Sequence, residues 1–315
     1  MLNKIMTTER ELSLVKPEKD TLLTVGIFDG VHRGHQHLLA ELVKEAGKKR
    51  LLSGVVTFRQ HPQAVLMPGS KLSFLTNLGE RERLLKDAGV GFVVALSFTR
   101  ELARLGPERF VDWLRTYLRM RGLVIGYDFA LGSGRAGDTE SLQRLGQVMG
   151  FSVRVVAPVT VGDEVVSSTA IREALERGDM AKVSRLLGRP FKLSGRVVTG
   201  ASRGKGLGYP TANLGVDPCQ ALPADGVYVS LVHIGNQSYP AMTYIGRRPT
   251  FGEKQEAVEN YLLDWSGDLY DREITIEIKH YLRGDRKFES AEELSRQIAA
   301  DVAEGRRLLT KTGKN

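Results

Sequence analysis

Cysteine is almost absent from this sequence, because Cys219 is the only one in 315 residues. An internal disulfide is therefore impossible, and Cys219 has no second thiol with which to bind a metal. We expect Cys219 to be a packing residue or a loop thiol. Such scarcity of cysteine is typical of a protein from a reducing compartment.

Long apolar runs are absent too, and none approaches the ~18–20 residues that span a bilayer. The first residues lack a cationic stretch followed by an apolar core, so they do not resemble a secretory signal. We therefore predict a cytoplasmic protein with no membrane partner. Residues 1–11 and 310–315 are expected to be frayed ends.

The charge balance favours anionic partners, since 45 basic and 37 acidic residues give a net charge of +8. The basic residues are spread along the chain and are not interleaved with aromatic ones. This distribution argues against nucleic acid as a partner. Small phosphorylated substrates are the better prediction.

The chain is long for one hydrophobic core, which rarely exceeds ~250–300 residues, so we expect two domains. In the first part, short apolar runs alternate with helical patterns. This alternation predicts a parallel sheet covered by helices on both faces. The strands are expected at 21–28, 51–58, 91–98, 122–127 and 151–158, and the helices at 35–49, 77–89, 108–120 and 139–150.

The pattern changes from about Phe191, where strand-like stretches are separated by Gly, Pro, Asn or Asp. Alternation of polar and apolar residues predicts an antiparallel sheet or a small barrel. Two helices broken at Gly178 should lead to a boundary near Gly188, giving domains 1–187 and 188–315, and Ser290 should cap a last helix. These strands are expected at 192–200, 226–235, 238–246, 257–265 and 272–282.

The first predicted strand runs into a turn and then into a helix whose first turn carries His32 and His35. A helix N-terminus attracts anions, and both imidazoles can donate hydrogen bonds to phosphate oxygens. A metal site would need a third ligand nearby, and a plain surface position is the common fate of a histidine. The two interleaved glycines favour phosphate. The other residues assigned to this phosphate site are Phe28, Asp29, Gly30 and Gly34.

A second phosphate clamp is predicted at the start of a later helix, where Ser167, Ser168 and Thr169 precede Arg172. Hydroxyls and a guanidinium at a helix N-terminus suit an anion. An ordinary helix cap explains the hydroxyls equally well. The residues alone do not decide between a phosphate clamp and a helix cap.

The segment GKGLGYPTANL, at 204–214, combines a glycine-rich loop with Thr211 and Asn213. A P-loop is excluded, because the glycine spacing is too short and no Ser or Thr follows the lysine. In extended chain, Thr211 and Asn213 face the same side and could bind Mg²⁺. The predicted phosphate-binding loop comprises Gly204, Lys205, Gly206 and Gly208.

Glu259 lies on a probable strand with apolar residues before it. Transfer of phosphate to an alcohol needs a base near the hydroxyl group. A buried carboxylate without a purpose is costly, so Glu259 is either a base or a structural hydrogen-bond acceptor. The residues alone do not decide between a base and an acceptor.

Four motifs in the first part resemble the nucleotidyltransferase superfamily, and in particular bacterial FAD synthetase domains. They are HRGH at 32–35, TFRQHP at 57–62, GYDFALGSGRAGD at 126–138 and SSTAIR at 167–172. The resemblance implies a Rossmann-like α/β domain that adenylylates FMN with ATP. It implies stabilisation of the transition state by His32, His35 and Arg172, and flavin binding by His61 and Asp128.

The second part is similar to riboflavin kinases in PTAN at 210–213 and in three later motifs, IGRRPTF, ENYLLDWSGDLYD and LRGDRKF. The resemblance implies a six-stranded Greek-key barrel followed by a helix. It also implies that Thr211 and Asn213 bind Mg·ATP and that Glu259 deprotonates riboflavin. Asp271 and Asp285 stand where these proteins often have Gly and Glu.

The whole chain resembles the bifunctional bacterial riboflavin kinase/FAD synthetase family. This implies riboflavin, FMN and ATP as substrates, FAD as product and Mg²⁺ as cofactor. Two alternatives are an enzyme active in only one half and a flavin or nucleotide sensor without turnover.

Overall fold

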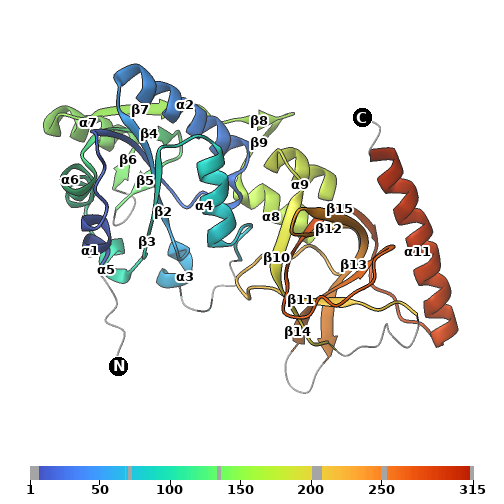
Figure 1. Cartoon of the computed structure of the whole chain (residues 1–315). Helices are drawn as coiled ribbons and strands as arrows, with labels where there is room; N and C mark the ends of the chain where they lie inside the picture. Colours follow the sequence, from blue (N-terminus) through green and yellow to red (C-terminus); the bar gives the residue numbers. More distant parts are fainter. Residues whose placement is uncertain are drawn as a thin grey trace, which may run out of the picture. The chain divides into compact units, whose positions relative to one another are not determined.

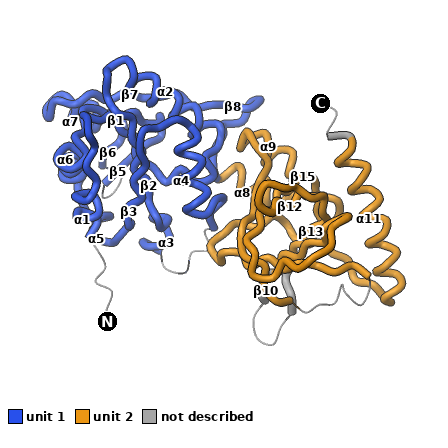
Figure 2. Tube along the Cα trace, in the orientation of Figure 1, with its two compact units in different colours: residues 1–168 blue, residues 169–315 orange. Residues whose placement is uncertain are grey.

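The computed structural model describes residues 7–67, 69, 73–132, 136–200, 208–249 and 254–312. The chain divides into two compact units, residues 1–168 and residues 169–315 (Figure 2). Each unit has a sheet of its own, and each is described separately below.

The first unit is built on a five-stranded parallel sheet with the strand order β3-β2-β1-β4-β7 (Figure 1). All five strands predicted from the apolar runs are present. The strands are β1 (Thr21–Val25), β2 (Leu52–Phe58), β3 (Phe92–Leu96), β4 (Met120–Gly126) and β7 (Ser152–Val156).

Helices cover both faces of this sheet, as the alternating pattern predicted. Leu23 of β1 packs into a core with α1, α6 and α7, whereas its neighbour Leu22 packs on the other face with α2 and α4. Successive residues of a strand point to opposite faces, so a strand buried on both sides is apolar throughout. The helices are α1 (Thr8–Ser13), α2 (Arg33–Lys49), α4 (Leu78–Asp87), α6 (Pro107–Leu118) and α7 (Thr139–Met149).

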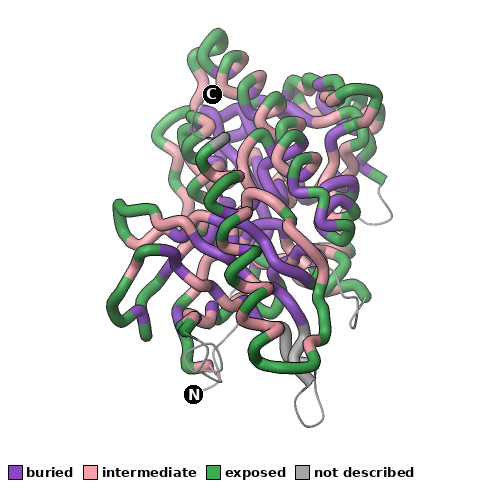
Figure 3. The backbone as a smooth tube through the Cα atoms, turned by 90° about the vertical axis from the view of Figure 1, so that its right-hand side faces the viewer, coloured by how far each residue is buried: buried purple, intermediate pink, exposed green. Residues whose placement is uncertain are grey.

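Burial follows this layering. Buried residues, shown in purple in Figure 3, lie along the strands and on the helix faces that pack against them, while the outer faces of the helices are exposed. Every residue of β1 is buried. The carboxyl end of β1 is therefore a rigid base for the loop that follows it.

The strand order also fixes where a ligand can bind. The chain moves outward from β1 to β2 and β3, and then returns to add β4 on the opposite side of β1. Ligands of open parallel sheets bind outside the carboxyl ends of the strands at such a switch point. In this unit the switch point lies between the ends of β1 and β4.

The expectation of a frayed N-terminus is wrong for residues 8–11, because they belong to α1. Leu12 of this helix is fully buried, and Glu11 accepts hydrogen bonds from the backbone and the hydroxyl of Ser97. Shorter elements complete the unit. They are η1 (Asp29–Val31), α3 (Pro62–Leu66), α5 (Arg100–Arg104), β5 (Ala130–Leu131), β6 (Gly137–Asp138), β8 (Thr160–Val161) and β9 (Glu164–Val165).

The second unit begins with the two predicted helices, α8 (Ser168–Glu176) and α9 (Met180–Leu187), the first residue of α8 belonging to the first unit. Gly178 separates them with a φ of 70°. Gly188 ends α9 in the left-handed conformation, with a φ of 75°. Both glycines therefore end a helix, as the sequence predicted.

Six strands then form a closed antiparallel barrel, in the order β10-β11-β14-β13-β12-β15. β12, β13 and β14 are consecutive, and β15 returns to lie beside β12, which is the Greek-key arrangement. The strands are β10 (Phe191–Val198), β11 (Ala212–Gly215), β12 (Gly226–Ile234), β13 (Gln237–Pro249), β14 (Lys254–Leu262) and β15 (Glu273–Arg283).

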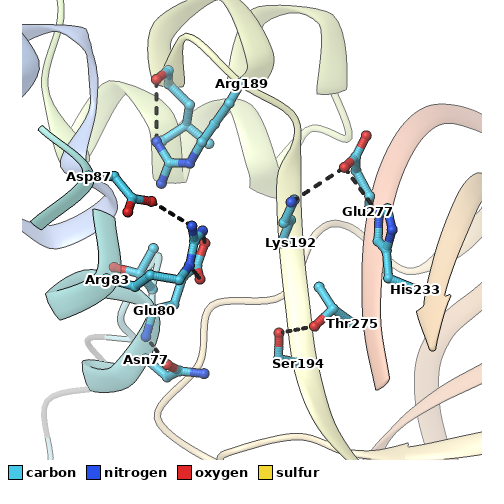
Figure 4. Close-up of polar contacts among 12 residues, drawn as sticks. Asn77, Glu80, Arg83, Asp87, Arg189, Lys192, Ser194, His233, Thr275 and Glu277 are labelled. Atoms are coloured by element: carbon cyan, nitrogen blue, oxygen red, sulfur yellow. Dashed lines mark hydrogen bonds and ion pairs between the residues drawn. The ribbon is translucent and has the colours of Figure 1, made fainter. Parts of the chain in front are cut away.

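Cross-strand pairs on the outside of the barrel match this register. Lys192 on β10 is directly opposite Glu277 on β15, and their charged groups lie 3.5 Å apart (Figure 4). Two residues along, the hydroxyls of Ser194 and Thr275 form a hydrogen bond of 2.9 Å. Such pairs favour one register over its neighbours.

The last helix, α11 (Ala291–Thr312), packs its apolar residues on β12 and β13. Ser290 caps it by accepting a hydrogen bond from the backbone N–H of Glu293 at 3.1 Å. Arg283 donates to the buried carboxylate of Asp301, with the shortest contact at 2.7 Å. The expectation of a frayed end from residue 310 is wrong for residues 310–312.

Candidate active sites

Every predicted functional motif of the first unit follows the carboxyl end of a strand of the parallel sheet. His32 follows β1, His61 follows β2, Asp128 follows β4, and Ser167 and Ser168 follow β7 after a small hairpin. Parallel strands bring these ends to one edge of the sheet. The structure thus brings together motifs that are far apart in the sequence.

The turn between β1 and α2 is held in an unusual backbone conformation. Phe28, Gly30 and Val31 all have positive φ angles, of 53°, 79° and 36°. Glycine adopts this conformation freely, whereas Phe and Val are strained in it. Strain of this kind persists where the surrounding structure over-determines the loop, which is common at functional sites.

Asp29 fixes this turn to the segment before α4. Its buried carboxylate accepts hydrogen bonds from the backbone N–H groups of Leu75, at 2.8 Å, and Thr76, at 3.3 Å. In return, the N–H of Gly30 donates to the Thr76 hydroxyl at 3.1 Å. Asp29 therefore has a structural role in the loop, and its contact with nucleotide stays a prediction.

The two predicted phosphate motifs meet at this turn, because the Ser168 hydroxyl donates to the backbone carbonyl of Asp29 at 3.0 Å. Ser167, next to it, is half-buried. Thr169 and Arg172 lie further along α8, beyond the boundary of the first unit. Their roles in phosphate binding stay predictions.

His32 is the N-cap residue of α2, and His35 lies in the first turn of that helix. The backbone N–H of His35 donates to Nδ1 of His32 at 3.3 Å, so in the neutral imidazole the proton of His32 is on Nε2. The two rings are stacked, with centroids 3.6 Å apart. A side chain at Gly34 would come within 3.2 Å of the His32 ring, so this position suits glycine.

The surroundings of His35 disfavour its charged form. Burial, and then the neighbouring His32, hold the pKa of His35 well below its usual value. Its Nδ1 atom is buried without a hydrogen-bond partner among the described residues. A buried polar atom in this state is a candidate for hydrogen bonding to a ligand.

Arg81 of α4 is a residue that sequence reasoning missed. Its side chain is 1% exposed and donates to the carbonyl of Ile27, at 3.2 Å, and to that of Phe58, at 2.7 Å. These carbonyls follow β1 and end β2, so Arg81 connects two strand ends. Burial lowers its pKa from the usual value, although the charge of Asp29 acts in the opposite direction.

The two residues assigned to the flavin differ in their surroundings. His61 caps α3 by accepting a hydrogen bond from the N–H of Gln63 at 3.2 Å, and its ring lies 5.8 Å from that of Phe74. Asp128 is exposed in the turn after β4. Flavin binding by either residue stays a prediction.

In the second unit, the barrel brings Thr211, Asn213 and Glu259 together. Asn213 of β11 is directly opposite Glu259 of β14 in the antiparallel ladder. The Thr211 hydroxyl donates to the Glu259 carboxylate at 3.3 Å. Residues 211 and 213 share one face of the chain, so three oxygen-bearing side chains lie together on it.

The position of Asn213 also explains why residue 200, just before the predicted phosphate loop, is glycine. A Cβ atom at Gly200 would lie 2.0 Å from Nδ2 of Asn213, a distance that no structure tolerates. Only glycine therefore allows Asn213 to take this position. Gly204, Lys205 and Gly206 lie outside the described residues, and Gly208 is an exposed turn residue with a φ of 83°.

Two tyrosines that the sequence analysis did not single out border this site. Tyr209 precedes Thr211 by two residues, and its ring packs edge-on against that of Tyr261 at 5.3 Å. Tyr244 of β13 is opposite Glu259. Burial, and then the charges of Asp285 and Asp225, raise the pKa of Tyr244.

The oxygens of this site suit Mg²⁺ that arrives with a nucleotide. Hydroxyl and amide oxygens are ligands for Mg²⁺, which usually takes only one or two ligands from the protein and the rest from phosphates and water. Within the described part of the chain, no group of three or more His, Cys, Asp or Glu residues could hold a metal ion by itself. Binding of Mg²⁺ by Thr211 and Asn213 stays a prediction.

Comparison with known proteins identifies a family for each half of the chain. The FAD synthetase family matches residues 15–170, and the riboflavin kinase family matches residues 187–309. The bifunctional riboflavin kinase/FMN adenylyltransferase of Escherichia coli K12 is 38% identical over 90% of this chain and 91% of its own. That of Pseudomonas fluorescens is 39% identical over 96% of this chain and 98% of its own.

The fold and the two family matches thus define an enzyme that joins a nucleotidyltransferase domain to a kinase domain. With relatives this similar over nearly its whole length, the chain belongs to the family of bifunctional riboflavin kinase/FMN adenylyltransferases. It combines an FAD synthetase with a riboflavin kinase, the enzymes that convert riboflavin to FMN and FMN to FAD.

One solved structure supports the fold over the full length. A crystal structure described as a macrolide-efflux protein from Streptococcus pneumoniae aligns with a TM-score of 0.85 and 33% identity, covering 96% of this chain and 97% of that one. Among the helices of the described residues, none has the length and apolar character needed to cross a membrane.

Proposed function

We propose that the chain carries out its two reactions at two separate sites, one in each half. Residues 1–187 form the adenylyltransferase and residues 188–315 form the kinase. The observation that carries the kinase assignment is the contact between Thr211 and Glu259 across β11 and β14, beside Asn213. A carboxylate next to metal-binding oxygens is what phosphate transfer to an alcohol requires.

In the kinase reaction, Glu259 takes the proton from the terminal hydroxyl of riboflavin. The oxygen then forms a bond to the γ-phosphorus of ATP, and ADP leaves. Thr211 and Asn213 would hold Mg²⁺, which would offset negative charge on the phosphates. Gly208, with Gly204, Lys205 and Gly206, lets backbone N–H groups approach the nucleotide.

In the adenylyltransferase reaction, an oxygen of the FMN phosphate attacks the α-phosphorus of a second ATP, and pyrophosphate leaves. The attacking phosphate is already an anion, so no protein base is needed. His32 and His35 donate hydrogen bonds to the phosphates at the start of α2, and Arg172 adds positive charge. His61 and Asp128 bind the flavin.

The remaining members of the predicted phosphate site shape the turn. Gly30 and Gly34 leave room for a phosphate near the backbone, while Phe28 and Asp29 hold the turn in place. Ser167, Ser168 and Thr169 supply N–H and hydroxyl groups at the start of α8. A cytoplasmic location stays the expectation from the sequence.

The test is to incubate the full chain with riboflavin, ATP and Mg²⁺ and to separate the flavins by chromatography. We expect FMN to appear first and FAD to follow. FMN alone would indicate an enzyme active in only one half, and unchanged riboflavin would indicate a sensor.

Variants assign each reaction to its site. Glu259→Gln should lower FMN formation by ~10²–10⁴-fold, the usual contribution of a general base, and leave FAD formation from supplied FMN intact. His32→Ala combined with His35→Ala should lower FAD formation and leave FMN formation intact. Glu277→Gln, on the outside of the barrel, and His37→Ala, on the exposed side of α2, are the matched controls. Loss of both activities in a folded single-site variant would contradict the assignment.

A further inference from the structure

Three buried polar side chains form a chain of hydrogen bonds across the interior of the barrel. Ser230 on β12, Thr243 on β13 and Asn260 on β14 are each 0% exposed. The hydroxyls of Ser230 and Thr243 lie 2.6 Å apart, and Thr243 donates to Oδ1 of Asn260 at 2.8 Å. Nδ2 of Asn260 donates to the backbone carbonyl of Ala212 on β11 at 3.2 Å. This chain of hydrogen bonds therefore links four neighbouring strands, β12, β13, β14 and β11.

The direction of these hydrogen bonds follows from their last member. A carbonyl oxygen can only accept, so Nδ2 of Asn260 must face Ala212 and Oδ1 must face Thr243. Thr243 gives its one hydroxyl proton to Asn260, so the proton of the 2.6 Å contact comes from Ser230, whose hydroxyl also faces the backbone carbonyl of Ala241 at 3.2 Å. Because a buried polar group is costly unless it is paired, each of these side chains depends on the next.

This chain of hydrogen bonds ends at the kinase site. Ala212 stands between Thr211 and Asn213, and Asn260 directly follows Glu259. Side chains of adjacent strand residues point to opposite faces, so Asn260 holds from inside the barrel the two strands that carry the site on the outside.

The backbone ladder at this point is short. β11 and β14 pair through two residues on each strand, whereas β12 and β13 pair through nine. The bond from Asn260 to Ala212 thus adds a buried side-chain link to this short ladder.

We infer that Asn260 is a positioning residue of the kinase reaction, setting the distance between Thr211 and Glu259 without contacting substrate. This rests on the proposed assignment of Thr211, Asn213 and Glu259 to the kinase site. Thr211 reaches Glu259 at 3.3 Å, near the upper limit of a hydrogen bond, so a small shift of β11 breaks the contact.

The test replaces Asn260 by leucine, which is similar in size and makes no hydrogen bond. We expect kcat of the kinase to fall by ~10²-fold, the effect of a displacement of about 1 Å, while KM for riboflavin changes less. FAD formation from supplied FMN by the same polypeptide should be unchanged. Both rates are measured in the full chain, well below the melting temperature of each variant.

Thr243→Val is the matched control, since it removes a hydrogen bond of the same chain but leaves the bond from Asn260 to Ala212. It should lower the melting temperature while the kinase keeps most of its kcat. If Asn260→Leu does not fold, Asn260→Asp replaces it, because the aspartate has the same size but no amide donor for Ala212.

The outcomes test the positioning role of Asn260 separately from the assignment of the kinase site. A fall of more than tenfold in kcat in a folded Asn260 variant supports the positioning role, and a smaller fall overturns it. If Thr211→Ala and Glu259→Gln leave the kinase active, the assignment of the site itself is wrong. If those two abolish the kinase but a folded Asn260 variant does not, only the positioning role is wrong.

Discussion

The imidazole rings of His32 and His35 lie face to face, with centroids 3.6 Å apart and planes inclined by 17°. Two rings this close cannot both carry a positive charge without strong repulsion, and His35 is the one held neutral. In the proposed role at phosphate, the pair would therefore act through hydrogen-bond donors more than as two cations. This distinguishes the site from a cluster of lysines or arginines.

The first prediction concerns the pH dependence of stability. Burial and then His32 lower the pKa of His35 below its ordinary 6.5, so below pH 6.5 the unfolded chain binds a proton that the folded chain does not. The free energy of unfolding should therefore fall as the pH is lowered from 6.5 towards the folded pKa, by up to ~1.4 kcal/mol per pH unit. Above pH 6.5 this contribution is constant.

The measurement is urea unfolding followed by the fluorescence of Trp113, in a Trp265→Phe background so that only the first unit reports. His35→Gln should show a shallower loss between pH 7.5 and pH 5.5, by about 1 kcal/mol. His37→Gln, exposed in the same helix, should keep the slope of the parent. Equal slopes in all three proteins would show that His35 does not remain neutral.

The second prediction concerns Arg81. Arg81→Met removes the donors to the carbonyls of Ile27 and Phe58, and should cost about 2–4 kcal/mol of stability and lower FAD formation. Arg83→Met, on the same helix, loses only surface ion pairs with Glu80 and Asp87 (Figure 4), and should cost less than about 1 kcal/mol. Similar losses for both variants, by Trp113 fluorescence, would argue against a special role for Arg81.

The third prediction concerns Gly200. Gly200→Ala places a methyl group 2.0 Å from Nδ2 of Asn213, so this side chain must move. We expect FMN formation to fall by ~10–10²-fold, with a higher requirement for Mg²⁺, while FAD formation persists. Gly215→Ala, on β11 itself, meets nothing closer than 3.1 Å and should be milder. The prediction fails if the two variants make FMN at similar rates.

The fourth prediction concerns Asp271, which precedes β15. Its φ is 61°, in the left-handed region that disfavours a side chain. Asp271→Gly should therefore stabilise the second unit by about 0.5–1 kcal/mol, measured by Trp265 fluorescence in a Trp113→Phe background. Asp264→Gly has a similar φ of 57° but loses the two hydrogen bonds from Arg306, so it should give no gain.

The elements that the sequence predicted well are those with one dominant signal. The five parallel strands lie in short, largely apolar runs, and the longer helices have a clear apolar stripe, so both are visible without tertiary information. β11 was missed as a strand because it is short and begins with Ala212 and Asn213, which carry little strand signal. α1 was missed because only Thr8 and Leu12 of its six residues are buried.

The site was predicted through its motifs, and the supporting residues were not. Arg81 and Asn260 occupy positions where polar residues are usually exposed, and no local pattern shows that these two are buried. Their importance arises from the tertiary fold, which places each against backbone carbonyls of a distant segment. A buried hydrogen bond of this kind has no counterpart in the periodicity of the sequence.

The position of β15 between β10 and β12 has a consequence for biosynthesis. The barrel cannot close until β15 has left the ribosome, about 130 residues after the last strand of the parallel sheet. At ~5–20 residues per second, the first half has roughly 6–25 s to fold alone. A nascent chain interrupted in that interval exposes the unpaired edges of β10 and β12, so it is an aggregation hazard even when its first half is already folded.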